Sequence, residues 1–329
     1  MARTDSLGNF LTDVATAIRE KKGTTDTIPA SNFDTEIASI EGGGKYAPRY
    51  IRFQGYEGAD LNDEIANLDT TNLTSMYYMF YGCKNITELD VSSFDTSKVT
   101  NMYYMFNGCS KLTSLDLSNF NTSNVTDMQG LFGSCKQIKT LDLSNFNTSN
   151  VTNMESMFSG SGVTSLNLSN FDTSNVTSIT NICNGCSNLT EVNLNGFNLN
   201  KVTYLSNTFM NCSKLTKILV NDWDVSNITS MNSVFRVCSA LETLDLSNWV
   251  TSKVTNMGYM FQNCSNLAHL DIRNFDFTKV TTYSSMFTGV PADCEIIVKD
   301  ETAKAWITSK FTTLTNVKTV AEYEAGTSA

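Results

Sequence analysis

The thiols are the side chains whose type and spacing in this chain could most readily do chemistry. Seven of the nine cysteines recur at a regular interval: Cys83, Cys109, Cys135, Cys186, Cys212, Cys238 and Cys264. Thiolates bind zinc, and thiols pair as disulfides. Equivalent positions of stacked repeats, however, lie only about 5 Å apart, where a thiol usually fills a tight turn as a small apolar group. We therefore expect buried, reduced thiols, with no metal and no cofactor.

Cys183 and Cys186 also spell C-x-x-C, a spacing found in redox and zinc motifs. Cys183, however, occupies a repeat position that holds phenylalanine elsewhere. The motif therefore reflects two neighbouring repeat positions, and we expect no redox or metal chemistry from it.

Catalytic residues are sparse. The one histidine, His269, precedes a Leu-Asp-Ile segment typical of a strand. No glycine-rich phosphate loop, nucleophile elbow or inward pair of carboxylates appears. The sequence therefore indicates a protein that is not an enzyme, with His269 at the surface of a strand.

Carboxylates also recur at one repeat position: Asp90, Asp116, Asp142, Asp245 and Asp271. Stacked carboxylates repel one another unless they are solvated, hydrogen-bonded or bridged by cations. No segment has the D-x-[DN]-x-[DN]-G calcium pattern. The pattern favours a solvated acidic face and leaves weak cation binding as the alternative.

Two groups of variable residues are candidates for contact with a partner. Tyrosines cluster in the first repeats: Tyr77, Tyr78, Tyr81, Tyr103 and Tyr104. Tyrosine offers a large contact area and a hydroxyl at low entropic cost, so these rings could form a binding surface, or pack against the N-terminal cap or a neighbouring subunit. The second group flanks the expected strands and includes Glu191, Lys217 and His269, because repeat proteins commonly bind on their strand face.

A repeated sequence motif must position all of these residues. The segment Leu115–Met128 has close copies that begin 26 residues apart, with one step of 25. The copies begin at Leu89, Leu141, Leu166, Val192, Ile218, Leu244 and Leu270, and a truncated one begins at Ile296. A constant period in the twenties is the signature of a solenoid. We expect a β-rich leucine-rich-repeat solenoid of about nine coils, with parallel strands, short turns and capped ends.

Two sets of equivalent positions indicate how the repeats stack. One is aromatic in every full repeat: Phe94, Phe120, Phe146, Phe171, Phe197, Trp223, Trp249 and Phe275. An internal stack is favoured over an exposed sugar-binding platform, because continuous exposure would promote aggregation. The other is threonine throughout, from Thr74 to Thr281, and predicts hydroxyl hydrogen bonds from one repeat to the next.

Residues 1–44 form a separate expected unit of two short helices. Leu7, Phe10, Leu11, Val14 and Ile18 keep helical spacing, and Phe33 and Ile37 form the stripe of a second helix before a glycine linker at 42–44. Two short helices cannot bury a core alone, so we expect this segment to mediate assembly, including homo-oligomers.

The solenoid is expected to span residues 45–298, including an N-terminal cap in which Tyr50–Gly55 alternates like an edge strand. Residues 299–329 are expected to form a cap helix, with Trp306 over the last repeat, then a short extended segment and a frayed end.

Composition excludes two classes of partner. A formal net charge of -10 and the absence of basic runs argue against nucleic acid. No stretch reaches the roughly 18 apolar residues that a membrane span needs, and the N-terminus has no apolar signal region, so neither membrane insertion nor classical secretion is expected.

The phrase Met-Phe-x-Gly-Cys-Ser-x-Leu-Thr-x-Leu-Asp-Leu-Ser-Asn-Phe-x-Thr-Ser-x-Val-Thr-x-Met closely resembles the BspA-like leucine-rich repeats, found in mycoplasma-type surface proteins. The resemblance covers roughly residues 65–298. It implies a solenoid whose Leu-x-Leu segments form a parallel sheet, a role in surface attachment and recognition, and no catalytic residues.

The ends carry a second, shorter resemblance. Residues 11–25, 28–40 and 314–325 look similar to segments of phage and prophage virion proteins, such as tail-fibre-like proteins. This resemblance implies a non-enzymatic virion protein, in a tail fibre, baseplate or other appendage, assembled in the host cytoplasm with other virion structural proteins. Its solenoid would bind a host surface protein or glycan, at a cell or mucosal surface. The alternative is a bacterial cell-surface adhesin or protein-interaction module of the BspA-like type.

Overall fold

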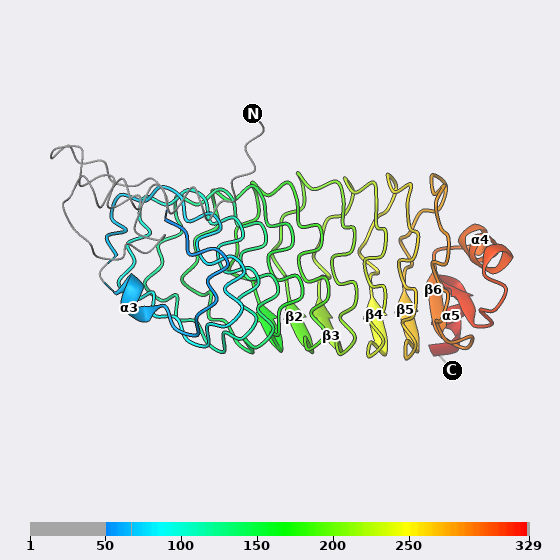
Figure 1. Ribbon diagram of the computed structural model, residues 1–329. Helices are drawn as coiled ribbons and strands as arrows, with labels where there is room; N and C mark the ends of the chain where they lie inside the picture. The colour runs from blue at the N-terminus through cyan, green and yellow to red at the C-terminus, as the bar shows by residue number, and fades with distance from the viewer. Residues whose placement is uncertain (1–50, 67, 328–329) are drawn as a thin grey trace, which may run out of the picture.

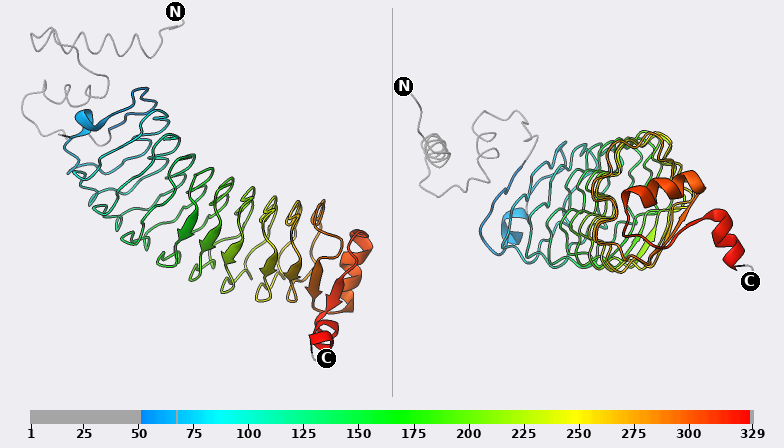
Figure 2. Two further views of the ribbon diagram at one scale, coloured as in Figure 1. Left: turned by 90° about the horizontal axis from the view of Figure 1, so that it is seen from below. Right: turned by 90° about the vertical axis from the view of Figure 1, so that its right-hand side faces the viewer.

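The repeats stack into a gently curved solenoid (Figures 1 and 2). The computed structural model describes residues 51–327 except Asn67. The helices expected within residues 1–44, with the assembly residues Leu7, Phe10, Leu11, Val14, Ile18, Phe33 and Ile37, lie outside the described residues.

Parallel strands run along one side of the later repeats. They are β1 (Ser165–Asn167), β2 (Glu191–Asn193), β3 (Lys217–Leu219), β4 (Thr243–Asp245), β5 (His269–Asp271) and β6 (Glu295–Val298). β1, β2 and β3 form one sheet, whereas β4, β5 and β6 form another that ends with β7 (Val317–Thr319). Each repeat strand pairs with the residues 26 positions later, as in Leu166 with Val192, so the sequence period sets the register.

The expected count of nine coils is not confirmed by these strands. From β1 to β6 the chain makes about five turns. Isolated parallel bridges join repeats at a second position, from Ser75 with Asn101 to Asn256 with Thr282, and no strand precedes β1 in the described part of the chain. Tight turns of small polar residues leave little extended backbone in each repeat, which explains why strand pairing is short.

Apolar side chains fill the inside of the solenoid. The aromatic set from Phe94 to Phe275 is buried throughout, as predicted, and Trp249 is fully inaccessible. A second aromatic file stacks face to face, with ring centroids of Phe80 and Phe106 5.7 Å apart. Burying such rings stabilises each repeat only through its neighbours, because a single repeat encloses no core of its own.

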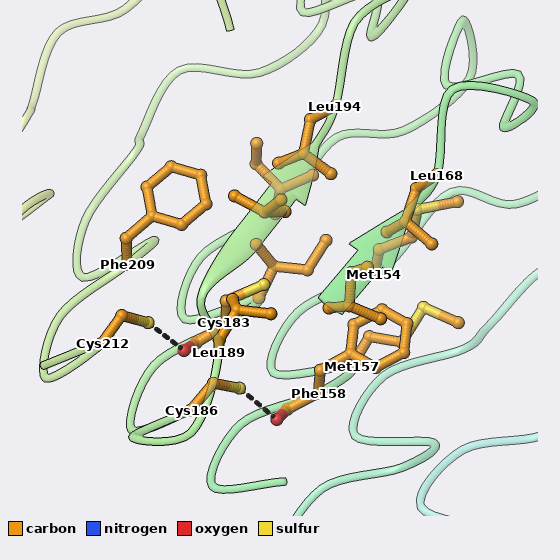
Figure 3. Packing of buried hydrophobic residues seen from close by; sticks show 14 of the residues in the cluster. Met154, Met157, Phe158, Leu168, Cys183, Cys186, Leu189, Leu194, Phe209 and Cys212 are labelled. Carbon is orange, nitrogen blue, oxygen red and sulfur yellow. Dashed lines mark hydrogen bonds between the residues drawn. The ribbon is translucent and has the colours of Figure 1, made fainter. Parts of the chain in front are cut away.

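All nine cysteines are buried thiols, in agreement with the prediction. The recurring thiols donate hydrogen bonds to backbone carbonyls of the preceding repeat. Figure 3 shows Cys186 and Cys212 pointing at the carbonyl oxygens of Phe158 and Cys183, at 3.0 and 3.1 Å. Ser161 holds one place in this set, and its hydroxyl lies 3.7 Å from the Cys186 sulfur.

Threonine hydroxyls connect the repeats as the sequence predicts. The Thr126 side chain donates to the Thr100 carbonyl at 3.1 Å, while its backbone N–H donates to the same oxygen at 2.8 Å. Thr152 repeats this arrangement on Thr126. Thr126 and Thr152 therefore each fix the position of their repeat on the one before.

The two ends differ from the repeats. At the N-terminal end, residues 51–55 are irregular rather than an edge strand, although the N–H groups of Phe53 and Gly55 donate to the carbonyls of Met79 and Tyr81. Helix α3 (Asn62–Ile65) follows and buries Ile65. The prediction of an edge strand is therefore wrong, because a turn at Gly55 interrupts the extended backbone. The backbone of this segment nevertheless hydrogen-bonds to the next repeat.

At the C-terminal end, α4 (Glu301–Lys310) lies across the last repeat (Figure 2). Asp300 caps it, since its carboxylate accepts from the Ala303 N–H at 3.0 Å. β7 supplies the expected extended segment, but the expected frayed end is wrong: residues 320–327 form α5 (Val320–Thr327). Lys304 of α4 pairs with Glu322 of α5 at 2.6 Å, which contributes to holding that turn in place.

Candidate binding surface

The five tyrosines expected to form a contact surface lie together. Ring centroids of Tyr77 and Tyr78 are 4.5 Å apart, and those of Tyr103 and Tyr104 are also 4.5 Å apart. Tyr78 joins the two pairs, with centroids 5.3 Å from Tyr103 and 4.7 Å from Tyr81. All five side chains are half-buried, so they form one continuous aromatic surface, named here the tyrosine cluster.

The backbone beneath the tyrosine cluster has an unfavourable conformation for large side chains. Tyr78 and Tyr104 have φ values of 57° and 54°, in the left-handed region. The equivalent position in most other repeats holds a residue that tolerates this region: Gly130, Ser156, Asn181, Asn207, Ser233 and Ser285. A bulky residue there costs roughly 1–2 kcal/mol. The aromatic rings at this position are therefore not required by the repeat itself.

An arginine that the repeat pattern does not identify lies against the tyrosine cluster. The Arg52 guanidinium carbon lies 4.1 Å from the centre of the Tyr77 ring, a cation–π contact. Arg52 belongs to the cap segment before the first repeat, so the repeat period gives no signal for this contact. A positive charge therefore borders the tyrosines on the side of the cap.

The Tyr103 hydroxyl of the tyrosine cluster stays protonated at physiological pH. Burial, with a hydrogen bond to Tyr78, raises the pKa of Tyr103 to about 12. A protonated phenol both donates and accepts hydrogen bonds. The surface therefore combines aromatic faces with a neutral polar group at Tyr103.

The strand-flanking candidates do not join the tyrosine cluster. Glu191 and Lys217 form an ion pair with each other across β2 and β3, and both are largely exposed. His269 lies on β5, where its Nδ1 is 2.9 Å from a Glu295 carboxylate oxygen. Lys318 binds the other oxygen at 2.6 Å and is the largest cause of the lowered pKa of Glu295. His269 is thus half-buried in a network with the C-terminal cap.

The carboxylates of the acidic set serve local turns. Asp116 and Asp142 are exposed, and each accepts the N–H of the serine two residues later, at 2.9 and 3.0 Å. These bonds lower the pKa of both carboxyls. Asp271 departs from the expected solvated face: it is 5% exposed and pairs with Arg273 at 2.6 Å.

Within residues 51–66 and 68–327, no three histidine, cysteine or acidic side chains are grouped closely enough to hold a metal ion. Among those same residues, none of the helices has the length and apolar character required to cross a bilayer.

Comparisons with known proteins identify one family. The family described as "Mycoplasma protein of unknown function, DUF285" matches residues 51–161, 128–221 and 184–299. No curated protein matches the chain.

Two of the solved structures that match are bacterial proteins. One is a leucine-rich cell surface protein from Faecalibacterium prausnitzii, with 17% identity and a TM-score of 0.27, covering 78% of this chain and 79% of that one. The other is the functional domain of InlJ from Listeria monocytogenes, described as including a cysteine ladder. It shares 15% identity, with a TM-score of 0.22, and covers 88% of this chain and 75% of that one.

The matching family agrees with the resemblance to mycoplasma-type surface repeats. Its description names mycoplasma proteins and no virion component. The expected virion role therefore finds no support in these findings.

Proposed function

Because this chain belongs to the family described as "Mycoplasma protein of unknown function, DUF285", we propose that it is a non-catalytic adhesion or protein-interaction module at a bacterial cell surface. In this proposal the repeats form a rigid scaffold, and the tyrosine cluster is the surface that contacts the partner.

The observation that carries the proposal is the clustering of five half-buried tyrosines, two of which, Tyr78 and Tyr104, stand at left-handed backbone positions. Glycine or asparagine would satisfy the same turn at lower cost than tyrosine, so the turn itself does not select the two rings. The rings gain contacts with one another but remain half-buried, so they present apolar area to a partner. Clustered tyrosines beside an arginine are also the residue types that dominate binding energy at protein interfaces.

The arrangement suits a protein or glycan surface better than a small charged ligand. The rings offer flat apolar faces and hydroxyls, and Arg52 adds a positive charge beside Tyr77. The partner class remains a host surface protein or glycan, as expected from the sequence.

The test measures adhesion of the full chain, labelled with a fluorophore, to cultured epithelial cells and to mucin-coated plates. The double variant Tyr78→Ser, Tyr104→Ser should bind at least about tenfold less, because central aromatic contacts are often worth more than 1.4 kcal/mol. Its unfolding midpoint should change little, since the strain relieved offsets part of the packing lost.

Tyr259→Ser is the matched control. Tyr259 occupies the same repeat position, with φ of 58°, but lies outside the tyrosine cluster. Unchanged adhesion of the control and reduced adhesion of the double variant would support the proposal. Equal adhesion of the double variant and the wild type would remove the tyrosine cluster as the contact surface. Conversion of a wild-type dimer to a monomer, with adhesion unchanged, would assign the cluster to contact between copies.

A further inference from the structure

A cavity of about 630 Å³ lies at the opposite end of the solenoid from the tyrosine cluster, between the last repeats and α4. Its wall includes Val250, Asp276 and Phe277 from two successive repeats, and Lys299, Asp300 and Trp306 from the C-terminal cap. A volume of this size is within the range of small-ligand sites, which is roughly 300–1,000 Å³.

The cavity is built where two repeats depart from the pattern. Val250 occupies a position that holds aspartate or asparagine in the other repeats, such as Asp224 and Asp276. At that position the side-chain oxygen accepts a hydrogen bond from the backbone N–H of the residue two places later. Asp224, for example, accepts from Ser226 at 2.9 Å. A valine has no acceptor for that bond, and Val250 is 48% exposed as a residue, so it does not fill the core either. Neither the turn nor the core therefore accounts for an apolar residue at 250.

Phe277 replaces the threonine that stands at this position in six other repeats, as Leu199 and Val225 also do. In the repeat before, Thr251 at the equivalent position accepts the Asp276 N–H at 2.8 Å and so fixes the next repeat. The last repeat has no successor, and Phe277 instead stacks on Trp306. This exchange places an aromatic wall on one side of the cavity, with Val250 adding a second apolar surface.

Polar groups of both signs complete the lining. The Asp276 carboxylate accepts the Thr278 N–H at 2.8 Å, and this partner is the largest cause of its lowered pKa, with Lys299 and Lys279 adding smaller contributions. The Asp276 carboxyl is therefore ionised at neutral pH. Lys299 can donate hydrogen bonds, whereas the carboxylate of Asp300 already caps α4. The charged groups of the lining are thus two carboxylates, one of them used by the helix cap, and one ammonium group.

From this geometry we propose that the cavity is a binding site for a neutral hexopyranose, as a free sugar or as the terminal unit of a glycan. A pyranose ring has a face of C–H groups that packs on apolar side chains, and a rim of hydroxyls that both donate and accept. Val250 and the edges of Phe277 and Trp306 would contact the C–H face. Asp276 and Lys299 would bind the hydroxyls, because hydrogen bonds to charged groups are about twice as strong as neutral ones.

The site is independent of the tyrosine cluster, so the two can fail separately. The experiment uses the full chain and saturation-transfer difference NMR, followed by calorimetry, with the methyl glycosides of glucose, galactose, mannose and N-acetylglucosamine. Sialic acid serves as a charged comparison. We expect one or more neutral glycosides to bind with a Kd on the order of 1 mM, typical of a single small site with few contacts.

Two variants test the assignment. Val250→Asp restores the residue type of the other repeats and places a carboxylate against the C–H face, so it should weaken binding about tenfold or more, which corresponds to 1.4 kcal/mol. Asp276→Asn should weaken binding several-fold, because the charge-assisted bond is lost. Asparagine stands at this position in other repeats, as Asn198 does, so the turn is preserved.

Asp224→Asn is the matched control, two repeats earlier and outside the cavity, and should leave sugar affinity unchanged. No binding of any neutral glycoside at millimolar concentration would overturn the proposal. Equal affinity of Val250→Asp and wild type, or preference for sialic acid, would do the same. Unchanged adhesion of Val250→Asp in the epithelial-cell assay would leave the role of the tyrosine cluster intact.

Discussion

Phe277 and Trp306 stack with ring centroids 4.4 Å apart and planes inclined by 12°, and this contact joins the last repeat to its cap helix. The Tyr283 ring meets Trp306 edge-on at 5.2 Å. An unmodified solenoid end exposes apolar side chains and unpaired backbone groups. The aromatic contact therefore closes the core at the position where stacking between repeats stops.

Replacing Trp306 with alanine should loosen the C-terminal end while leaving the first repeats intact. Trp306 is half-buried, so the local cost should be roughly 2 kcal/mol, below the 3–5 kcal/mol of a fully buried aromatic. Because repeats contact only their neighbours, the effect should decay along the solenoid. Hydrogen exchange should show faster exchange in β6 and β7 and unchanged exchange around Asn101 and Asp127. Trp306→Phe, which keeps a stacked ring, should be intermediate; uniform loss of protection would contradict local capping.

Val237 offers a stabilising substitution. Its φ is 61°, in the left-handed region, where β-branched side chains are strongly disfavoured. The equivalent positions one repeat before and after hold Asn211 and Asn263, at similar φ. Val237→Asn should therefore raise the free energy of unfolding by about 1 kcal/mol, since asparagine tolerates this conformation. The midpoint of urea unfolding would measure the change.

A control separates backbone strain from polarity at Val237. Val237→Gly should also stabilise, but by less, because glycine gains conformational freedom in the unfolded chain. Val237→Thr keeps the β-branch and should not stabilise. An increase in stability for Val237→Thr equal to that for asparagine would show that backbone strain is not the cause.

The stacked aspartates predict a defined response to acid. Hydrogen bonds from the serine two residues later hold the pKa values of Asp90, Asp116 and Asp142 below the ordinary range. A depressed folded-state pKa gives stability that is present above the unfolded pKa, near 3.9, and is lost as pH falls through the folded value. The wild type should therefore lose stability as pH falls from about 5 towards 2.

Asparagine provides the matched variant for this effect, because Asn167 and Asn193 occupy the same repeat position and accept the same kind of N–H. The triple variant Asp90→Asn, Asp116→Asn, Asp142→Asn should lose less stability than the wild type between pH 5 and pH 2, measured by urea midpoints at each pH. Identical pH profiles would mean that these carboxyls titrate alike in the folded and unfolded chain.

The repeat period was sufficient to predict the stacking, because each position faces its own copy in the next repeat. This rule placed Phe120 inside and Thr126 on a ladder, and it identified the cysteines as buried turn residues. It could not give the extent of strand structure, since Leu115 and Leu166 occupy equivalent positions but only Leu166 lies in a strand.

Contacts between different parts of the chain were less accessible to sequence reasoning. Arg52 lies before the first repeat, so no period links it to Tyr77. The cavity beside α4 depends on Val250 and Phe277, which look like unremarkable apolar substitutions until the cap helix is placed against them. The same holds for α5, whose pairing of Glu322 with Lys304 crosses 18 residues. Residues that differ from the repeat pattern are visible in the sequence, but the residues that they contact are known only from the structure.

The buried thiols should be unreactive in the folded protein. Cys135 is fully inaccessible, its sulfur donates to the Phe106 carbonyl at 3.1 Å, and burial raises the pKa of its thiol to about 12. Thiolate is the reactive form, so labelling by a disulfide reagent at neutral pH requires local opening. We expect slow labelling of the native chain and rapid labelling of all nine cysteines in concentrated urea. Fast labelling without denaturant would contradict this packing.

A pair of substitutions at Cys135 then tests whether the thiol's hydrogen bond contributes to stability. Cys135→Ser should be tolerated, because Ser161 occupies the equivalent place and serine retains a donor. Cys135→Val removes the donor and leaves the Phe106 carbonyl without this partner, which should cost about 1–2 kcal/mol more than serine. Urea unfolding of the two variants would measure the difference, with Cys135→Ala as a control for volume. Greater stability of the valine variant than of the serine variant would show that apolar packing alone determines this position.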